Sequence, residues 1–398
     1  MPTPLRIALF SGNYNYVRDG ANQALNRLVG YLLSQGHAVR VYSPTTETPA
    51  FNPVGDLVGL PSLPIPKRPE YRLASGLTRK VRRDLAAFVP DIVHISAPDI
   101  AAHQAISWAR RNDLAAVASI HTRFETYLSY YHLQLFEPVL RALFRSLYRK
   151  CDALLVPTES TAAVLRAQHM NHTIHLWSRG VDRTLFNPAR RSLEYRRSIG
   201  LADDDIVITY LGRLVREKGL NDFADACDQL TARGIAHKVL VIGDGPARNA
   251  FAERLPNAIF TGHQVGIELA RALASGDIFL NPSITETFGN VTLEAMACAL
   301  PVVAAAATGA TSLVRDGDTG LLVKPGDIGQ YANALECYIC DPELRRAHGG
   351  SGLAFAETQD WDHINAAVEN AYYRVIERRI NISRSLSVDV VHRERYLL

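Results

Sequence analysis

Short apolar runs alternate with amphipathic stretches along most of the chain. The run RIALF at 6–10 predicts a buried strand, and residues 21–35 carry apolar side chains at helical spacing until Gly36 ends the pattern. Residues 37–43 predict the next strand, so the chain opens with a βαβ unit and therefore with a parallel sheet. Further strand-like runs, separated by helical segments, lie at 91–96, 115–120 and 153–158.

The same alternation starts again at Asp205. A helix is expected at 221–234, and strand-like runs lie at 206–214, 237–245, 258–262, 277–283, 301–306 and 319–325. The last expected helix covers 362–378, whereas the segment after Arg379 alternates basic and apolar residues and has no assigned element. Two units of the same kind predict an α/β protein with two Rossmann-like domains. The boundary between the two domains is expected within 180–200, where a proline and a cluster of charges interrupt the alternation of strands and helices.

The composition indicates a water-soluble protein with two cores. Of the 398 residues, 47% are hydrophobic and 21% are charged, and no run approaches the roughly 20 apolar residues that span a bilayer. The short apolar stretch near the N-terminus predicts a strand and not a signal peptide. The five cysteines are scattered, and the CxxC pair Cys337 and Cys340 has no second pair to complete a zinc site. We expect buried, reduced thiols of a cytosolic protein, and no metal ion.

The charge is divided unevenly between the two halves of the chain. Residues 1–199 hold 25 basic and 14 acidic residues, a balance of +11. Residues 200–398 hold 18 and 26, a balance of −8. Halves of opposite charge indicate different partners.

Two glutamates flank a predicted helix start in the second half. Glu286 precedes a Phe-Gly-Asn turn, and Glu294 follows after seven intervening residues. Gly289 permits close backbone approach, and the N–H groups at a helix start suit a phosphate. The two carboxylates can accept hydrogen bonds from paired hydroxyls, such as those of a sugar and a ribose. On spacing alone, two solvated charges at a helix entry are an equally good interpretation.

Two cations follow the first predicted strand of the second domain. Arg213 comes directly after it and Lys218 lies five residues further on. Open α/β sheets bind ligands at the carboxyl ends of their strands, where these cations can neutralise a diphosphate leaving group. Taken alone, the pair is also compatible with two surface cations.

These elements belong to a longer series of motifs. In the second half the series reads Gly212-Arg213, Glu217-Lys218-Gly219, Gly243-Asp244-Gly245-Pro246, Glu286-Thr287-Phe288-Gly289, Leu293-Glu294-Ala295-Met296-Ala297 and Gly320-Leu321-Leu322-Val323. In the first half it reads Asp19-Gly20, Gly36-His37, Pro90-Asp91-Ile92-Val93-His94, His121-Thr122 and Gly180-Val181-Asp182. Over about residues 5–375 the chain resembles the family-4 retaining glycosyltransferases. Its segment 120–131 is similar to that of glycolipid-forming mannosyl-, glucosyl- and sulfoquinovosyl-type members.

The resemblance implies the GT-B fold, in which the parallel sheets of two Rossmann-like domains face a central cleft. The expected domains are an acceptor-side domain at 1–185 and a nucleotide-sugar-binding domain at 186–365. A C-terminal helix and tail at 366–398 would return to the first domain.

The resemblance also implies roles for individual residues. The diphosphate of the donor would be gripped by Arg213 and Lys218, the transferred sugar by Glu286 and the ribose by Glu294. Gly20 and His121 would act on the donor from the first domain, and His121, like His94, ends a predicted parallel strand. The remaining donor-binding positions would be Gly243, His263, Phe288, Gly289, Asn290 and Val291.

Some features depart from the family pattern or argue against other classes. Gly20 is single where many relatives have a glycine pair, and the loop at 309–312 lacks the usual glycine-rich segment ending in glutamate. A dinucleotide fingerprint after the strand at 237–245 would need glycine where Arg248 stands, which argues against a nicotinamide dehydrogenase. No carboxylate is placed as a nucleophile, so the resemblance implies same-face, front-side substitution without a metal or other cofactor.

Two basic stretches in the first half indicate a surface for the acceptor. One contains Lys67, Arg68, Arg79, Lys80, Arg82 and Arg83, and the other carries Arg141, Arg145 and Arg149 at four-residue spacing beside apolar residues. An amphipathic basic helix fits an anionic lipid surface, although each stretch alone is equally well read as a solvated helix face. Nucleic acid fits less well, because no aromatic residues interleave with the basic runs.

The sequence therefore predicts a retaining hexosyltransferase that uses a UDP- or GDP-sugar. Its acceptor would be a membrane lipid or lipid-linked glycan, and the protein would bind peripherally to the inner face of the cytoplasmic membrane. The alternatives are a transferase that uses a soluble acceptor or assembles polysaccharide, a non-catalytic nucleotide-sugar-binding protein, and a nucleotide-sugar epimerase.

Overall fold

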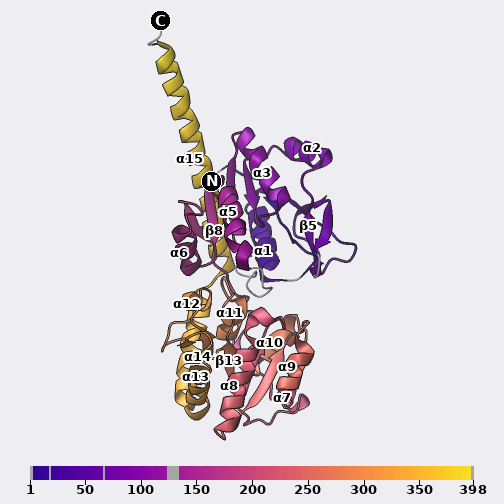
Figure 1. The fold of residues 1–398 in the computed structure, drawn as a ribbon, viewed down its shortest axis with the longest axis vertical. Coiled ribbons are helices and arrows are strands. Elements are labelled where there is room, and N and C mark those ends of the chain that lie inside the picture. The colour runs from indigo at the N-terminus through magenta and orange to yellow at the C-terminus, as the bar shows by residue number, and fades with distance from the viewer. Residues whose placement is uncertain (1–2, 18, 66–67, 123–133, 396–398) are drawn as a thin grey trace. The chain divides into compact units, whose positions relative to one another are not determined.

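The computed structural model describes residues 3–17, 19–65, 68–122 and 134–395, without the side chains of Arg68, Pro69, Gln134 and 382–395. The chain forms two compact units (Figure 1). The first comprises Met1–Thr122, Leu135–Ser178 and Trp361–Leu398, and the second includes Arg179–Asp360. The functional boundaries at residues 185 and 365 stay predictions.

The first unit is built on a seven-stranded parallel sheet of order β3-β2-β1-β6-β7-β8-β9. Its strands are β1 (Arg6–Phe10), β2 (Ala38–Pro44), β3 (Asp56–Leu60), β6 (Ile92–Ile95), β7 (Ala115–Ser119), β8 (Ala153–Val156) and β9 (Ile174–Leu176). β4 (Ser62–Ile65) and β5 (Arg68–Ala74) form a separate antiparallel hairpin. The parallel sheet predicted from the βαβ pattern is confirmed. The short strands β3, β4, β5 and β9 were not predicted.

Helices cover both faces of this sheet. They are α1 (Gly20–Ser34), α2 (Arg79–Phe88), α3 (Ile100–Arg111), α5 (Glu137–Tyr148), α6 (Glu159–Ala167) and α15 (Trp361–Arg395), with a 3-10 turn, η2 (Gln134–Phe136). Successive strand residues point to opposite faces, so Ala8 and Phe10 pack against α2, α3, α5 and α6. Ile7 and Leu9 pack against α1 and α15. A sheet buried on both faces explains its continuous apolar runs.

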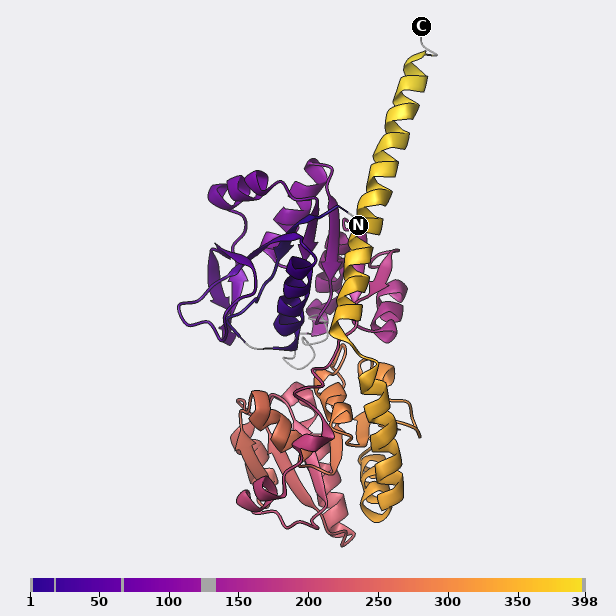
Figure 2. The same ribbon diagram turned by 180° about the vertical axis from the view of Figure 1, so that it is seen from behind.

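The C-terminal helix α15 belongs to the first unit, which confirms the predicted return. Its buried Val368 and Tyr372 enter the core that α1 also covers. The carboxylate of Glu369 lies 3.0 Å from both the Tyr31 hydroxyl and His37 Nε2. Figure 2 shows this helix, in yellow, lying along the first unit. It runs to Arg395, through the segment that the sequence left unassigned.

The second unit has a six-stranded parallel sheet of order β12-β11-β10-β13-β14-β15. Its strands are β10 (Val207–Leu211), β11 (Lys238–Ile242), β12 (Ile259–Gly262), β13 (Ile278–Asn281), β14 (Val302–Ala305) and β15 (Gly320–Val323). One face packs on α10 (Gly266–Ala274), α11 (Asn290–Ala297) and α14 (Pro342–Glu357), and the other on α8 (Leu220–Ala232), α9 (Arg248–Arg254) and α13 (Ile328–Cys340). Shorter elements are η3 (Pro188–Arg190), α7 (Leu193–Ser198), η4 (Arg216–Lys218) and α12 (Ala310–Leu313).

The cysteines follow the expectation only in part. Cys151, Cys227 and Cys298 are free and buried, whereas Cys337 and Cys340 are free and exposed. The prediction of burial is therefore wrong for the CxxC pair. The pair lies on α13, whose core-facing side is formed by other residues of the helix such as Leu335 and Tyr338.

Among the described residues, no helix is long and apolar enough to cross a bilayer. Within the same part of the chain, no three His, Cys, Asp or Glu side chains are grouped as metal ligands would be.

Candidate active site

The strand order of the second unit indicates where a ligand can bind. The chain adds β11 and β12 on one side of β10 and then returns to add β13, β14 and β15 on the other. β10 and β13 are therefore neighbours whose following connections leave in opposite directions. In open parallel sheets, ligands bind at the carboxyl ends of two such strands.

The connections after β10 and β13 bring two predicted site residues together. Nζ of Lys218, in η4, lies 2.5 Å from Oε1 of Glu286. The two side chains are 24% and 21% exposed, so the pair is shielded but remains reachable from solvent. A hydroxyl of Thr308 donates to the Glu286 carbonyl at 3.0 Å, and Thr285 donates to the Glu217 carbonyl at 3.2 Å. These bonds fix both loops beside the ion pair.

Glu286 is followed by the start of α11. Gly289 has φ 101°, a left-handed conformation that favours glycine, and its carbonyl accepts from the amides of Thr292 and Leu293. The N-cap position of this helix is Gly289, which has no side chain to cap the first turn. The amides of the first turn and the helix dipole therefore make this end of α11 suited to a phosphate or a sugar oxygen.

The other predicted residues of this stretch differ in burial. The ring of Phe288 is buried in the core, so only its backbone is available to a ligand. Asn290, Val291 and Glu294 are half-buried on α11. The charge of Glu294 adds to burial in raising the pKa of Cys298 to about 12, which places this carboxylate near the thiol.

Arg213 is held at the end of β10 through its backbone. The Tyr210 hydroxyl donates to the Arg213 carbonyl at 3.3 Å, and the Val215 amide donates to the same oxygen at 3.0 Å. Burial raises the pKa of Tyr210, and the charges of Glu286 and Glu217 raise it further. Tyr210 thus supports the candidate site without having been predicted. Its signal in the sequence, an aromatic residue near a strand end, is a weak one.

Gly243 and His263 lie at the same edge of the sheet, after β11 and β12. Gly243 has φ 140°, and a Cβ there would meet the Gly212 carbonyl oxygen at 2.0 Å. Its amide donates to the Gly262 carbonyl at 2.9 Å, which binds the two loops together. His263 follows β12, the edge strand, and is exposed.

In the first unit, Gly20 and His121 also occupy strand-end connections. Gly20 is the first residue of α1, after Asp19, whose side chain accepts from the Asn22 amide in a capping box. His121 follows β7 and is 9% exposed. Its Nε2 lies 2.9 Å from the Ser119 hydroxyl, and its ring meets the edge of Trp177 at a centroid distance of 5.2 Å.

The two basic stretches have different surroundings. Lys67 lies outside the described residues, and the side chain of Arg68 is not described. The four other cations of the first stretch are exposed on α2: Arg79, Lys80, Arg82 and Arg83. On α5 the guanidinium of Arg141 pairs with Glu137, while Arg145 and Arg149 donate to the carbonyls of Gln168 and His169 at the end of α6. The α5 arginines therefore have intramolecular partners.

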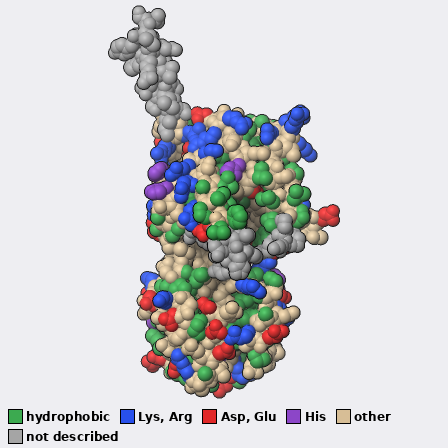
Figure 3. All heavy atoms as spheres, in the orientation of Figure 1, with side chains coloured by type: hydrophobic (Ala, Val, Ile, Leu, Met, Phe, Trp, Pro, Cys, Tyr) green, Lys and Arg blue, Asp and Glu red, His purple; other side chains and the backbone are tan. Residues whose placement is uncertain are grey.

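A row of exposed apolar side chains runs from η2 into α5. The exposed fractions are 88% for Leu135, 61% for Phe136, 68% for Val139 and 50% for Leu143. Figure 3 shows hydrophobic side chains on the surface where Figure 1 labels α5. A row of this kind is unusual on a helix that packs in a soluble domain.

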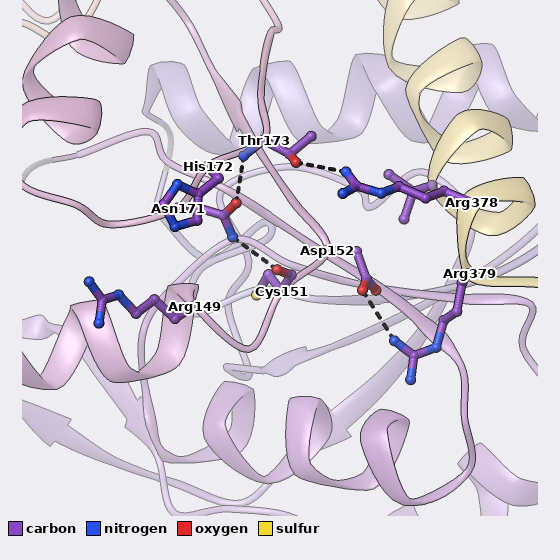
Figure 4. Close-up of a pocket in the computed structure, with 9 residues that line it drawn as sticks. Arg149, Cys151, Asp152, Asn171, His172, Thr173, Arg378 and Arg379 are labelled. Atoms are coloured by element: carbon purple, nitrogen blue, oxygen red, sulfur yellow. Dashed lines mark hydrogen bonds and ion pairs between the residues drawn. The ribbon is translucent and has the colours of Figure 1, made fainter. Parts of the chain in front are cut away.

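A separate pocket of about 240 Å³ lies in the first unit, at the end of the sheet opposite to His121 (Figure 4). It is lined by residues that precede β8 and β9, so it faces the amino ends of parallel strands. Arg379 of α15 pairs with Asp152 at 3.1 Å, and Arg378 donates to the Thr173 hydroxyl at 3.1 Å. These contacts fasten α15 to the sheet and lie away from the strand ends that carry His121.

Comparisons with known proteins show which family the chain resembles. The profile of the family described as "Glycosyl transferases group 1" matches residues 205–341, and that of "Glycosyltransferase Family 4" matches residues 18–185. The chain is 33% identical to the sulfoquinovosyl transferase SQD2 of Arabidopsis thaliana over 381 residues, covering 93% of this chain and 74% of that protein. It is 27% identical to a GDP-mannose-dependent alpha-mannosyltransferase of Corynebacterium glutamicum, covering 94% and 90% of the two chains.

A solved structure shows the same fold. The sucrose-phosphate synthase of Thermosynechococcus elongatus superposes with a TM-score of 0.77 at 21% identity, over 94% of this chain and 99% of that chain.

Proposed function

This chain belongs to glycosyltransferase family 4, whose members are retaining hexosyltransferases that use nucleotide sugars. We propose that it transfers a hexose from a UDP- or GDP-sugar to a membrane lipid or lipid-linked glycan. It has the GT-B fold. The observation that carries the proposed donor site is the Lys218–Glu286 pair at the switch point between β10 and β13.

Each group of this site has a task in the proposal. Lys218 and Arg213 hold the donor diphosphate, with the start of α11 opposite them. Glu286 accepts hydrogen bonds from hydroxyls of the transferred sugar, and Glu294 accepts them from the ribose. Gly243, His263 and the stretch 288–291 line the nucleotide and the sugar.

The cations act most strongly as the bond to the leaving group breaks. The bond from the anomeric carbon to the diphosphate oxygen opens while the acceptor hydroxyl attacks on the same face. The electron pair of the broken bond stays on the diphosphate oxygen, so negative charge grows there, and the proton of the acceptor hydroxyl passes to that oxygen. In this proposal Arg213 and Lys218 stabilise that charge, as cations do in other electrostatically preorganised sites. His121 donates a hydrogen bond to the donor sugar, and Gly20 brings the loop before α1 onto the diphosphate.

The exposed apolar row of η2 and α5 supports the lipid acceptor. Leu135, Phe136, Val139 and Leu143 can enter the interfacial region of a bilayer, and the exposed cations of α2 can bind anionic headgroups. The first half of the chain also carries the excess of positive charge. A protein docked in this way meets an acceptor hydroxyl at the membrane surface.

The test is release of nucleoside diphosphate by the purified protein. Thermal-shift measurements with UDP, GDP and their sugars first select the donor, because a ligand that binds only the folded state raises apparent stability. Nucleoside diphosphate should then form only when vesicles containing the acceptor are added, and Lys218→Met and Glu286→Gln should abolish it while the fold survives. Unchanged turnover in both variants contradicts the site, and conversion of the donor without acceptor indicates an epimerase.

A further inference from the structure

Four buried polar side chains form a hydrogen-bond chain inside the first unit. The Tyr372 hydroxyl, on α15, lies 2.7 Å from Nδ1 of His94, at the end of β6. Nε2 of His94 lies 2.8 Å from the hydroxyl of Ser119, the last residue of β7. The same hydroxyl lies 2.9 Å from Nε2 of His121. The chain thus links the C-terminal helix to the first-unit histidine of the candidate site.

The direction of this chain is set at its Tyr372 end. Tyr372 is fully buried, and among the described residues its hydroxyl has His94 Nδ1 as its hydrogen-bond partner. If the imidazole donated here, the phenolic hydrogen would be buried without an acceptor, which costs free energy. Tyr372 therefore donates, and Nδ1 of His94 accepts.

The remaining hydrogens follow in order. A neutral His94 that accepts at Nδ1 carries its hydrogen on Nε2 and donates it to Ser119. The Ser119 hydroxyl is 3% exposed and lies between two imidazole nitrogens, so its own hydrogen goes to Nε2 of His121. His121 then accepts at Nε2 and carries its hydrogen on Nδ1.

The surroundings keep His94 neutral and orient both rings. Burial lowers the pKa of His94 to about 3. Trp177 meets both imidazoles edge-on, with centroids 6.1 Å from His94 and 5.2 Å from His121. Its indole N–H lies 3.4 Å from the Asn365 side-chain oxygen, so α15 also supports the tryptophan.

We propose that Tyr372 is a positioning residue that, through His94 and Ser119, holds His121 as the neutral tautomer with its hydrogen on Nδ1. The proposal rests on the proposed function, in which His121 contacts the donor sugar. With hydrogen fixed on Nδ1 this nitrogen is a hydrogen-bond donor, whereas in the other tautomer the same nitrogen is an acceptor. The return of α15 to the first unit thus serves the active site as well as the core.

The test reads the tautomer and the turnover separately. The full-length protein is labelled with ¹⁵N-histidine, and two-bond ¹H–¹⁵N spectra show which imidazole nitrogen carries hydrogen. The His121 signals are assigned by their absence in His121→Gln. Tyr372→Phe removes only the hydroxyl, and Ser119→Ala cuts the chain at a second point in case the first variant fails to fold. The control is Tyr373→Phe, whose lost hydroxyl donates to the Thr3 carbonyl and not to a histidine.

The proposal expects hydrogen on Nδ1 of His121 in the unmodified protein and in Tyr373→Phe. In Tyr372→Phe and Ser119→Ala the two tautomers should mix, and kcat should fall roughly five- to tenfold, the effect of one lost hydrogen bond. Hydrogen on Nε2 in the unmodified protein, or the same tautomer in all variants, overturns the proposal. A mixed tautomer with unchanged kcat keeps the positioning but overturns the role of His121 in the proposed transfer.

Discussion

Replacement of Lys218 by Met should weaken the binding of the nucleoside diphosphate about 30-fold. The change keeps the length of the side chain and removes its charge. A charge-assisted hydrogen bond is worth about 1.5–3 kcal/mol, and the Coulomb energy of two charges 4 Å apart near a protein surface is about 4 kcal/mol. The Lys218 side chain is 24% exposed and its ammonium is already paired with Glu286, so the diphosphate must compete for it. We therefore take about 2 kcal/mol, which corresponds to the 30-fold change.

The same competition predicts that Glu286→Gln, unlike Lys218→Met, does not weaken the binding of the nucleoside diphosphate. Without the carboxylate, Lys218 is available to the diphosphate, so the affinity for the nucleoside diphosphate should stay the same or rise a few-fold. Turnover should still be lost, because the amide no longer accepts two sugar hydroxyls as a carboxylate does.

The assay is isothermal titration calorimetry with UDP and with GDP at about 0.15 M salt, where surface charges are screened. Lys238→Met is the matched control, because Lys238 is exposed at the amino end of β11 and so lies at the opposite edge of the sheet. A Kd for Lys218→Met within twofold of the unmodified protein would refute the reasoning, since the ammonium would then make no contact with the diphosphate.

Three further predictions test the surface, the core and the thiols. Val139→Asp should reduce binding to anionic phosphatidylglycerol vesicles about tenfold in flotation assays, because an apolar contact is replaced by a charge. The control Ile267→Asp, at an exposed position on α10 of the second unit, should not reduce it. Burial lowers the pKa of His94 to about 3, so below pH 6.5 the unfolded chain binds a proton at this residue that the folded chain does not bind. The free energy of unfolding should therefore fall as the pH drops from 6.5 toward 3, by up to about 1.4 kcal/mol per pH unit. Urea titrations of His94→Gln should show a shallower fall, and an equal slope would exclude His94 as its source. Mass spectrometry should find iodoacetamide on the exposed Cys337 and Cys340 of the native protein, and on Cys151, Cys227 and Cys298 only after unfolding.

The repeated alternation of strands and helices was readable because it is local. The apolar runs of β1 and β10 are short and continuous, as buried parallel strands require, and the helices that follow them have clear periodicity. The Lys218–Glu286 pair could be anticipated for a related reason. Both residues follow strands whose carboxyl ends share one sheet edge, although only the strand order places β10 beside β13.

Contacts between distant parts of the chain could not be read in this way. Tyr372 reaches His94 across 278 positions, and nothing around either residue indicates the other. Arg196 lies in the charged stretch interpreted as the domain boundary, yet it is fully buried and paired with Asp277 at 3.1 Å. The exposure of Cys337 depends on which side of α13 meets the sheet, and the CxxC spacing does not contain that information.

The most direct test of the central claim is the fate of the anomeric carbon. The purified protein is incubated with the donor selected by thermal shift and with vesicles of membrane lipid, and the anomeric ¹H signals are followed by NMR. The nucleotide-sugar signal should disappear only when lipid is present, and a new glycosidic signal of the same anomeric configuration should replace it. Glu286→Gln should leave the donor intact. A product of inverted configuration, or a donor consumed equally by Glu286→Gln, would contradict the account.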